Sequence, residues 1–287
     1  MHRRDLASLV ALSTLALTVG VGCPEEPKPT PPKPATVATV VTPVTTTTAA
    51  AKTPTPAGKD GPMGTATIKG VVNFSGKAPE MKVPKKRKDA EFCKTKEVKY
   101  NAVIADGGKL AETFVRLSND SVKGEYKAPA KHGEIDQVDC MYSPRIQGVV
   151  AGQELDIKNQ DGTLHNVHTF KGTETWFNQA QPKGSPEISK ELEDTKVIKF
   201  TCDVHPWMRG FVVVSSHPFF AVTGKDGSFT IDKVPAGKYE VEAWHPHYGL
   251  KKVSVEAVEG KPSEVTFAYD GTEKEPDENK DEMKDLF

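Results

Sequence analysis

The fold of this protein is predicted most directly by the stretch VIKFTCDVHPWMRGFVVV, residues 197–214. Apolar and polar side chains alternate from Val197 to Cys202, which is typical of a strand with one buried face. Phe211 to Val214 is a nearly continuous apolar run, which is typical of a buried strand. The stretch therefore predicts two strands joined by a short loop, and that loop carries the residues CDVHPWM.

The loop contains three side chains that bind soft metal ions. Cys202, His205 and Met208 follow the spacing C-x2-H-x2-M. A thiolate with imidazoles selects copper or zinc, and an added thioether favours copper. A blue-copper electron-transfer site also needs a second imidazole, and the upstream segment LHNVH supplies His165. In a strand His168 would face the opposite side, so we predict His165 as the ligand, with His168 as the alternative.

Short alternating segments separated by turn residues continue in both directions from this stretch. They include Ile68 to Phe74, Phe114 to Leu117, Leu155 to Lys158, Phe229 to Ile231, Tyr239 to Ala243, Val253 to Val258 and Val265 to Phe267. Many short strands with frequent turns predict an all-β fold built from β-sandwiches. The helical signal is weak, and we expect a single helical turn at Ile188 to Asp194.

The N-terminal region predicts export and a membrane anchor. Residues 1–22 combine a basic start with an apolar run shorter than the roughly 20 residues of a bilayer span, as in a secretory signal peptide. Small residues precede Cys23, and the pattern resembles a bacterial lipoprotein signal; secretion without lipidation is the alternative. Residues 23–63 are rich in proline and threonine and predict a disordered tether. The acidic residues 270–287 predict a disordered tail.

The composition excludes two classes of protein. Lys and Arg number 38 against 39 Asp and Glu, a formal net charge of -1, whereas nucleic-acid binders usually carry a basic surplus or stripe. The chain has one long apolar run, at the N-terminus, and this run is shorter than a bilayer span. The sequence is therefore not that of a multi-span membrane protein. We therefore expect no nucleic-acid partner. From the N-terminal signal we expect a location in the periplasm or at the cell surface, with a lipid anchor in a membrane.

The two metal-binding segments resemble those of the cupredoxins, the plastocyanin- and amicyanin-like blue-copper family. The resemblance lies in HNVH, residues 165–168, and in CDVHPWMRGFVVV, residues 202–214. It implies a Greek-key β-sandwich with one mononuclear type 1 copper site. The implied copper ligands are His165, Cys202, His205 and Met208.

The same resemblance assigns roles to two neighbours of the ligands and a second role to one of the ligands. Asn166 would hydrogen-bond across to the ligand loop and brace it. Trp207 would lie partly exposed beside the imidazole of His205. The His205 imidazole would be the route by which electrons reach the surface.

The remaining β segments resemble a carboxypeptidase-regulatory, transthyretin-like β-sandwich, a structural or adhesive module. Residues 216–244 carry this resemblance, and residues 68–79 resemble the opening strand of the same module. The whole chain resembles larger bacterial proteins described as methylamine-utilisation-like or plastocyanin-like. The expected organisation has an N-terminal β segment at 64–130, the copper domain at 131–216 and the regulatory-like module at 217–269. Two arrangements stay open: the module is discontinuous, with the copper domain inserted in it, or the two are in tandem.

The chain has four cysteines. Cys23 is assigned to lipid and Cys202 to copper, which leaves Cys93 and Cys140. Exported proteins form disulfides readily, so we predict that Cys93 and Cys140 pair. Two buried free thiols are the alternative.

The favoured function is an electron carrier, and not an enzyme by itself. Such a carrier would meet a transient redox partner, for which a cytochrome or a dehydrogenase is typical. The alternative is a surface scaffold lipoprotein that stores or delivers copper, or holds none. A multicopper or nitrite-reductase-like enzyme is disfavoured because it needs further histidine sets, and His245 with His247 is the one pair of that kind.

Overall fold

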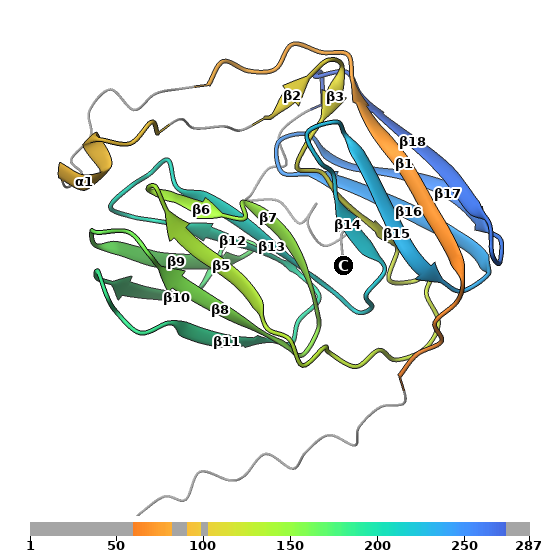
Figure 1. Cartoon of the computed structure of the whole chain (residues 1–287), viewed down its shortest axis with the longest axis horizontal. Helices are drawn as coiled ribbons and strands as arrows, with labels where there is room; N and C mark the ends of the chain where they lie inside the picture. The colour runs from red at the N-terminus through yellow and green to blue at the C-terminus, as the bar shows by residue number, and fades with distance from the viewer. Residues whose placement is uncertain (1–59, 82–90, 99–102, 274–287) are drawn as a thin grey trace, which may run out of the picture. The chain divides into compact units, whose positions relative to one another are not determined.

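The computed structural model describes residues 60–81, 91–98 and 103–273 of the chain (Figure 1). The predicted signal peptide, Cys23, most of the tether and most of the acidic tail lie outside the described residues. The described residues form β-strands and one short helix, α1 (Glu91–Lys94), which confirms the predicted all-β fold class. None of the helices in these ranges is long and apolar enough to cross a membrane.

The middle of the chain folds into a sandwich of two sheets, here called the ligand sandwich because it carries the predicted ligands. Its larger sheet has the order β10 (Glu174–Gln181), β9 (His165–Lys171), β12 (Val197–Thr201), β13 (Arg209–Ser215) and β7 (Ile146–Val150). Its smaller sheet has the order β11 (Ile188–Leu192), β8 (Gln153–Asn159), β5 (Gly133–Val138) and β6 (Met141–Ser143). The pairs β13–β7 and β5–β8 are parallel, and the other neighbours are antiparallel.

The core of the ligand sandwich lies between these two sheets. Ile135 and Ile157 of the smaller sheet share one buried cluster with Phe200 and Val212 of the larger sheet. The next residue on β13, Val213, belongs to a different buried cluster. Both faces of β13 are therefore buried, which explains why its sequence is nearly continuously apolar rather than alternating.

The segment Ile188–Leu192 forms β11, so the predicted helical turn there is wrong. This strand pairs antiparallel with β8, and Ile188 lies opposite Ile157. Both ends of the segment, Ile188 and Leu192, are buried. Residues four positions apart share a face in a strand as well as in a helix, so their spacing does not distinguish the two.

Strands from both sides of the ligand sandwich build a second sandwich. One of its sheets has the order β15 (Ser228–Val234), β1 (Ala66–Phe74), β3 (Lys109–Leu110) and β2 (Ala105–Asp106), with β18 (Pro262–Tyr269) paired to β1. The other sheet has the order β14 (Phe220–Val222), β4 (Phe114–Leu117), β16 (Gly237–His245) and β17 (Gly249–Ala257).

The strand pairing decides between the two arrangements that the sequence left open. β1 runs parallel to β18 along its length, from Thr67 opposite Pro262 to Phe74 opposite Tyr269. β4 pairs with both β14 and β16. The second sandwich is therefore discontinuous in sequence, and the ligand sandwich is inserted between β4 and β14.

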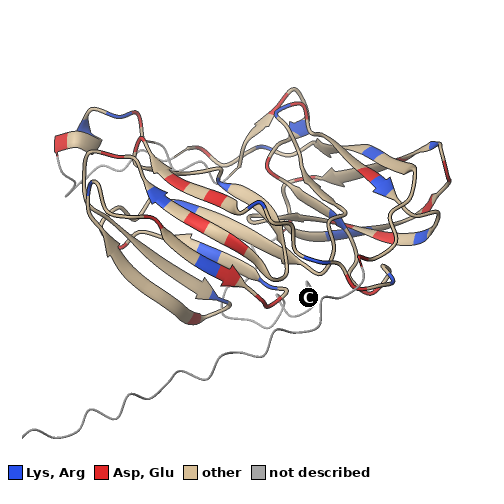
Figure 2. Ribbon diagram, turned by 60° about the horizontal axis from the view of Figure 1, so that its bottom comes forward, with Lys and Arg blue, Asp and Glu red and all other residues tan. Residues whose placement is uncertain are grey.

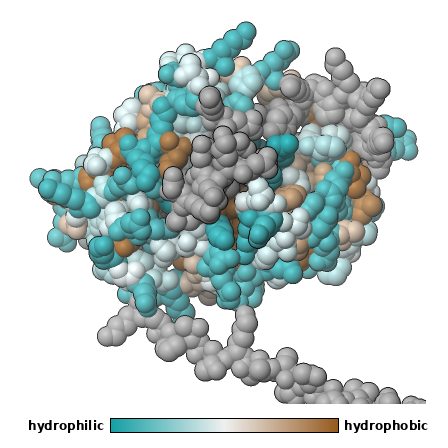
Figure 3. All heavy atoms as spheres, turned by 180° about the vertical axis from the view of Figure 1, so that it is seen from behind, coloured by the Kyte–Doolittle hydropathy of each residue, from teal (hydrophilic) through white to brown (hydrophobic). Residues whose placement is uncertain are grey.

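The surface of the protein is mixed in character. Figure 2 shows Lys and Arg interspersed with Asp and Glu along the strands, in keeping with a net charge of -1. On the face in Figure 3, hydrophobic side chains form small groups between hydrophilic ones. The charge and hydropathy of the surface thus say less about the function than the buried polar residues of the ligand sandwich do.

Candidate metal centre

Three predicted ligands converge at one end of the ligand sandwich. A nitrogen of His165, a nitrogen of His205 and the sulfur of Cys202 all lie within 4.8 Å of one another, and all three residues are buried. The two Nδ1 atoms, of His165 and His205, are 2.8 Å apart, and Cys202 Sγ lies 3.6 Å from His205 Nδ1. Both imidazoles therefore turn the same ring nitrogen toward the thiol.

The strand arrangement explains this convergence. β9 begins at His165, and its neighbour β12 ends at Thr201, one residue before Cys202. The two strands pair antiparallel, so the start of β9 and the end of β12 lie at the same end of the sheet. The loop from β12 to β13 then places His205 beside them. The fourth predicted ligand, Met208, is fully buried in the same cluster as Cys202, and its backbone N–H donates to His205 O at 2.9 Å.

Asn166 connects β9 to the ligand loop. Its Oδ1 accepts the backbone N–H of Asp203 at 2.7 Å and lies 3.4 Å from Cys202 Sγ. Its Nδ2 donates to Asp203 Oδ2 at 3.0 Å and to Asn178 Oδ1 at 2.8 Å. Asn166 therefore hydrogen-bonds from the start of β9 across to the ligand loop.

The site favours the thiolate form of Cys202. Burial alone would raise the pKa of this thiol, but hydrogen bonds with His165 and His205 outweigh burial and lower the pKa to about 6. Burial alone would lower the pKa of His165, but its hydrogen bonds with Asp161 and Cys202 raise it. The thiolate is the form of cysteine that binds metals.

Asp161 is a site residue that sequence reasoning missed. Its Oδ2 lies 2.8 Å from His165 Nε2, and its side chain is buried. The same carboxylate accepts the backbone N–H groups of Asp139 and Cys140, each at 2.8 Å. A carboxylate on the outer nitrogen of a metal-binding histidine fixes the ring orientation and makes the imidazole a stronger donor. The one sequence signal is an aspartate four residues before His165, which is common by chance.

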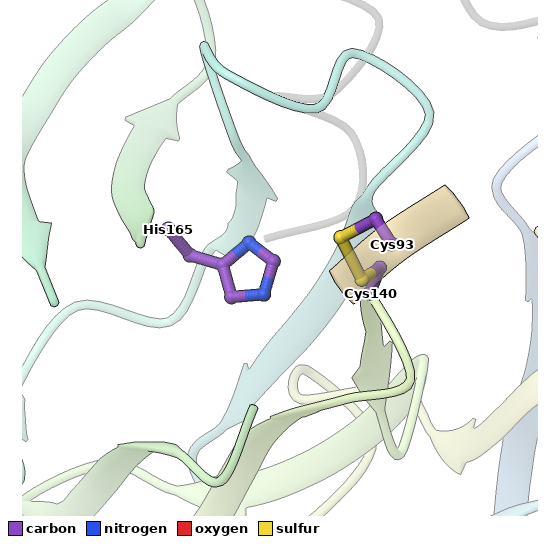
Figure 4. Close-up of side chains that lie close together, drawn as sticks. All are labelled: Cys93, Cys140 and His165. Atoms are coloured by element: carbon purple, nitrogen blue, oxygen red, sulfur yellow. A yellow bond between two sulfur atoms is a disulfide. The ribbon is translucent and has the colours of Figure 1, made fainter. Parts of the chain in front are cut away.

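The predicted disulfide between Cys93 and Cys140 is present, with an S–S distance of 2.02 Å. It lies against the ligand histidines. Cys93 Sγ is 3.5 Å from His205 Nε2, and Figure 4 shows the two sulfurs facing the ring of His165. Because the two sulfurs are bonded to each other, they are neighbours of the site rather than ligands.

The disulfide and its surroundings bury the edge of the site that the sequence predicted to be exposed. His205 is 0% exposed and Trp207 5%. Trp207 Nε1 donates to Cys140 O at 2.9 Å, and its ring centroid lies 5.1 Å from that of His205. The expected partial exposure of Trp207 is wrong because Cys140 and α1, which are distant in sequence, cover the ligand loop.

The other histidines that the sequence singled out do not join the cluster. His168 faces away from it, with Nδ1 2.9 Å from Asp203 Oδ1 and Nε2 2.9 Å from Thr175 Oγ1. Neither His245 nor His247 belongs to a metal-ligand cluster among the described residues. His245 Nδ1 instead accepts the backbone N–H of His247 at 3.1 Å.

The donor set of the cluster fits copper. A thiolate, two imidazoles and a buried thioether in one loop-and-strand arrangement are the ligands of blue-copper electron-transfer sites. The hydrogen-bonded carboxylate of Asp161 supplies the outer support that metal-binding histidines normally have.

One family model matches part of the chain. The β-sandwich domain of ER membrane protein complex subunit 7 matches residues 201–284, a range that includes the ligand loop and the C-terminal strands of the second sandwich. No curated relative matches the chain. A second β-sandwich in the C-terminal part is therefore shown, whereas its finer resemblance to the carboxypeptidase-regulatory module stays a prediction.

Among solved structures the chain is similar to several copper proteins. A purple cupredoxin from Nitrosopumilus maritimus has 23% identity and a TM-score of 0.27, over 29% of this chain and 99% of that chain. Amicyanin from Paracoccus versutus has 20% identity and a TM-score of 0.27, over 35% and 91%. A copper-containing nitrite reductase from Thermus scotoductus has 14% identity and a TM-score of 0.27, over 39% and 25%. These similarities concern part of the chain and its fold, and the case for a metal therefore stands on the residues of the site.

Proposed function

We propose that this protein is a membrane-anchored blue-copper protein that carries single electrons. The ligands would be His165, Cys202, His205 and Met208. The observation that carries the proposal is the buried convergence of two imidazole Nδ1 atoms with a thiol whose pKa is lowered to about 6. A copper ion bound there would supply a one-electron Cu(II)/Cu(I) couple.

The chain's own residues keep the ligands in place. Asn166 ties the start of β9 to the ligand loop, and Asp161 fixes the outer nitrogen of His165. The cluster of Cys202, Trp207 and Met208 excludes water from the thiolate. A ligand set fixed in this way changes little between oxidation states. This suits electron transfer better than a reaction that must admit a substrate.

A visible absorption spectrum tests the copper site. Full-chain protein loaded with Cu(II) should show an intense blue or green band, because the Cys202 thiolate dominates the electronic structure of such a site. The band should disappear in Cys202→Ala. His168→Ala is the matched control: it removes a histidine from the same strand that is not a ligand, so the band should remain. A colourless protein, or the same spectrum with Cys202→Ala, would refute the assignment.

The rest of the proposal concerns location and partners. Residues 1–22 would direct export, Cys23 would carry the lipid, and the protein would lie in the periplasm or at the cell surface. Its partner would be a transient redox protein, such as a cytochrome or a dehydrogenase. Cys23→Ser should move the protein from the membrane fraction to the soluble fraction, and continued membrane association would contradict lipid anchoring at this residue.

One observation favours copper storage as a second candidate. His205 is 0% exposed behind the disulfide, and an enclosed ligand set releases metal slowly. A storage protein would bind copper tightly but show no reversible one-electron couple. Voltammetry of the copper-loaded protein therefore separates the two functions: a reversible couple supports the carrier, and its absence supports storage.

A further inference from the structure

The two strands that carry His165 and Cys202 are not paired with each other at the ligands themselves. The last registered pair between β9 and β12 is His168 with Thr201. His165 and Cys202 both lie beyond that pair, so the ladder between these two strands does not fix the distance between the two ligands. Side chains must supply the links across this gap.

One link across the gap comes from Asn166, whose Oδ1 accepts the backbone N–H of Asp203. A second link comes from Tyr142 on β6, in the smaller sheet. Its Oη donates to Thr201 O at 2.9 Å and lies 3.3 Å from Asn166 O. A hydroxyl has one proton to donate, so the bond to Thr201 is the stronger and Asn166 O is a weaker second acceptor. Tyr142 thus joins the end of β12 to the start of β9 from the opposite sheet.

The hydrogen bond to Thr201 acts on the position of the thiolate. The Thr201 carbonyl and the Cys202 N–H belong to one planar peptide group. A fixed carbonyl therefore fixes the plane from which the Cys202 side chain leaves the backbone. The second acceptor belongs to Asn166, the residue directly after His165. One hydroxyl therefore acts on the spacing between the thiolate and an imidazole.

Packing holds the side chain of Tyr142 in this orientation. The residue is buried, and its ring centroid lies 5.9 Å from that of Phe200. A Cβ added to Gly210 would lie 3.1 Å from Tyr142 Cβ, so β13 is in close contact with the tyrosine. Burial raises the pKa of the Tyr142 phenol, and the negative charges of Cys202 and Asp203 raise it further. The hydroxyl therefore keeps the proton that it donates.

The turn that precedes this tyrosine is also fixed. Both residues of the loop between β5 and β6 have positive φ, 53° at Asp139 and 60° at Cys140, as in a type I′ turn. A cysteine seldom adopts such a φ, and strained backbone persists where surrounding contacts hold it. Cys140 has three such contacts: the disulfide to Cys93, its N–H to the carboxylate of Asp161, and its carbonyl with Nε1 of Trp207. The start of β6 is therefore tied to the supports of both imidazoles.

We propose that Tyr142 is a positioning residue for the copper ion, because its hydroxyl sets the spacing between Cys202 and His165 and so the geometry in which these ligands bind. This inference deepens the proposed function and rests on it. Tyr142 acts through the backbone at Thr201 and Asn166 rather than as a ligand.

Tyr142→Phe tests the proposal, because it removes the hydroxyl and keeps the ring. In the full chain loaded with Cu(II), this change should weaken Cu(II) binding by about tenfold, as the loss of a residue that orients metal ligands does. It should also change the relative intensities of the visible bands, because the overlap of the thiolate with the metal depends on where Cys202 lies. Competition with a chelator and absorption spectroscopy measure the two effects.

Tyr269→Phe is the matched control in the second sandwich. Tyr269 is fully buried, and its Oη donates to Ala243 O at 2.7 Å and lies 3.0 Å from Gly249 O. This variant loses the same kind of hydroxyl, shared between two backbone carbonyls, but at no copper ligand. Urea unfolding of the metal-free proteins compares their stabilities. The copper affinity and band intensities of Tyr269→Phe should match those of the original protein.

Replacement of Tyr142 by 4-aminophenylalanine is a second test, because the amine keeps an N–H donor at the same place. Both copper properties should return toward those of the original protein. Three results would each overturn the proposal: Tyr142→Phe leaves both properties unchanged, Tyr269→Phe changes them equally, or the amine restores neither.

The same measurements separate this inference from the copper site itself. A visible band that is missing in the unmodified protein refutes the copper carrier, and the role of Tyr142 with it. A band and a copper affinity that are the same in the unmodified protein and in Tyr142→Phe refute the role of Tyr142 alone.

Discussion

The carboxylate of Asp161 sets the electrical environment of His165. It is buried, lies 2.8 Å from His165 Nε2, and is held by two backbone N–H groups. A negative charge at this position strengthens the imidazole as a donor and favours the more highly charged oxidation state of the metal. Asp161 thus acts on the site through His165, without touching the metal position.

Asp161→Asn should raise the reduction potential of the copper-loaded protein and weaken Cu(II) binding by about tenfold, because the amide keeps the shape but removes the charge. Potentiometric titration measures the first effect, and competition with a chelator measures the second. Asp203→Asn is the matched control, since that exposed carboxylate contacts His168 and Asn166 but no ligand imidazole. Equal potentials for the original protein and Asp161→Asn would contradict this role.

His217 links the stability of the second sandwich to pH. Its Nε2–H donates to Leu117 O at 3.0 Å, and its Nδ1 accepts the N–H of Phe219 at 3.2 Å. A proton on Nδ1 would face another N–H. Burial, and then the charge of Arg116, lower the pKa of His217 to about 4 from 6.5.

Because this pKa is lowered on folding, the unfolded chain takes up the proton first as the pH falls. The stability due to neutral His217 is therefore present above pH 6.5 and is lost as the pH falls from 6.5 to about 4. The loss is about 3 kcal/mol in the free energy of unfolding. Urea unfolding across this pH range should show a shallower pH dependence for His217→Gln than for the original protein. The same pH dependence of the free energy of unfolding in both proteins would show that His217 does not cause this dependence.

The disulfide joins helix α1 to the turn between β5 and β6. The sequence positions of Cys93 and Cys140 differ by 47, and closing such a loop stabilises a folded chain by roughly 4 kcal/mol in the chain-entropy model. The disulfide is beside the ligands without being one of them. Its stability effect and its effect on the copper spectrum should therefore separate.

The double variant Cys93→Ala with Cys140→Ala should lower the free energy of unfolding by about 3–4 kcal/mol. It should keep the visible band of the Cu(II) protein, because both sulfurs lie outside the ligand set. Denaturant unfolding and absorption on the same sample measure both. Loss of the band in a protein that is still folded would show that the disulfide is needed to assemble the ligands.

The two sandwiches are connected twice in the sequence, once before and once after the ligand sandwich. The parallel pairing of β1 with β18 brings residue 67 opposite residue 262. Gly70 allows the close approach of these strands, because a Cβ there would lie 1.9 Å from Val265 O. The chain must therefore fold past the ligand sandwich before the second sandwich can close, and such long-range pairing is slow to form.

Gly70→Ala should destabilise the protein by about 3 kcal/mol, since the clash is with backbone that cannot move without breaking the sheet. Lys69→Ala is the matched control on the same strand. Its ion pair with Glu264, at 3.2 Å, is exposed, so its loss should change the free energy of unfolding by less than about 0.5 kcal/mol. Thermal unfolding compares the two, and equal stabilities would mean that β1 and β18 are not paired this closely.

The local sequence pattern was enough to predict most of the strands, the loop between β12 and β13, and the approach of His165 to that loop. The alternation in 197–201 and the spacing of Cys202, His205 and Met208 are properties of neighbouring residues, and they are the same in any fold that keeps the strands. His165 was also predictable, because it opens a strand with a motif of its own. The prediction of a helical turn at Ile188 to Asp194 was wrong, because apolar residues four positions apart share one face in a helix and in a strand alike.

Long-range packing decided the rest. Asp161 supports His165 only because a loop and a turn meet there, and α1 covers His205 only because the disulfide brings α1 to the ligand loop. The discontinuous second sandwich likewise depends on strands far apart in sequence. The physical reason is that hydrophobic burial and hydrogen bonding act between whichever surfaces meet in space. A sequence pattern shows which face of a segment is buried, but not which other segment packs against that face.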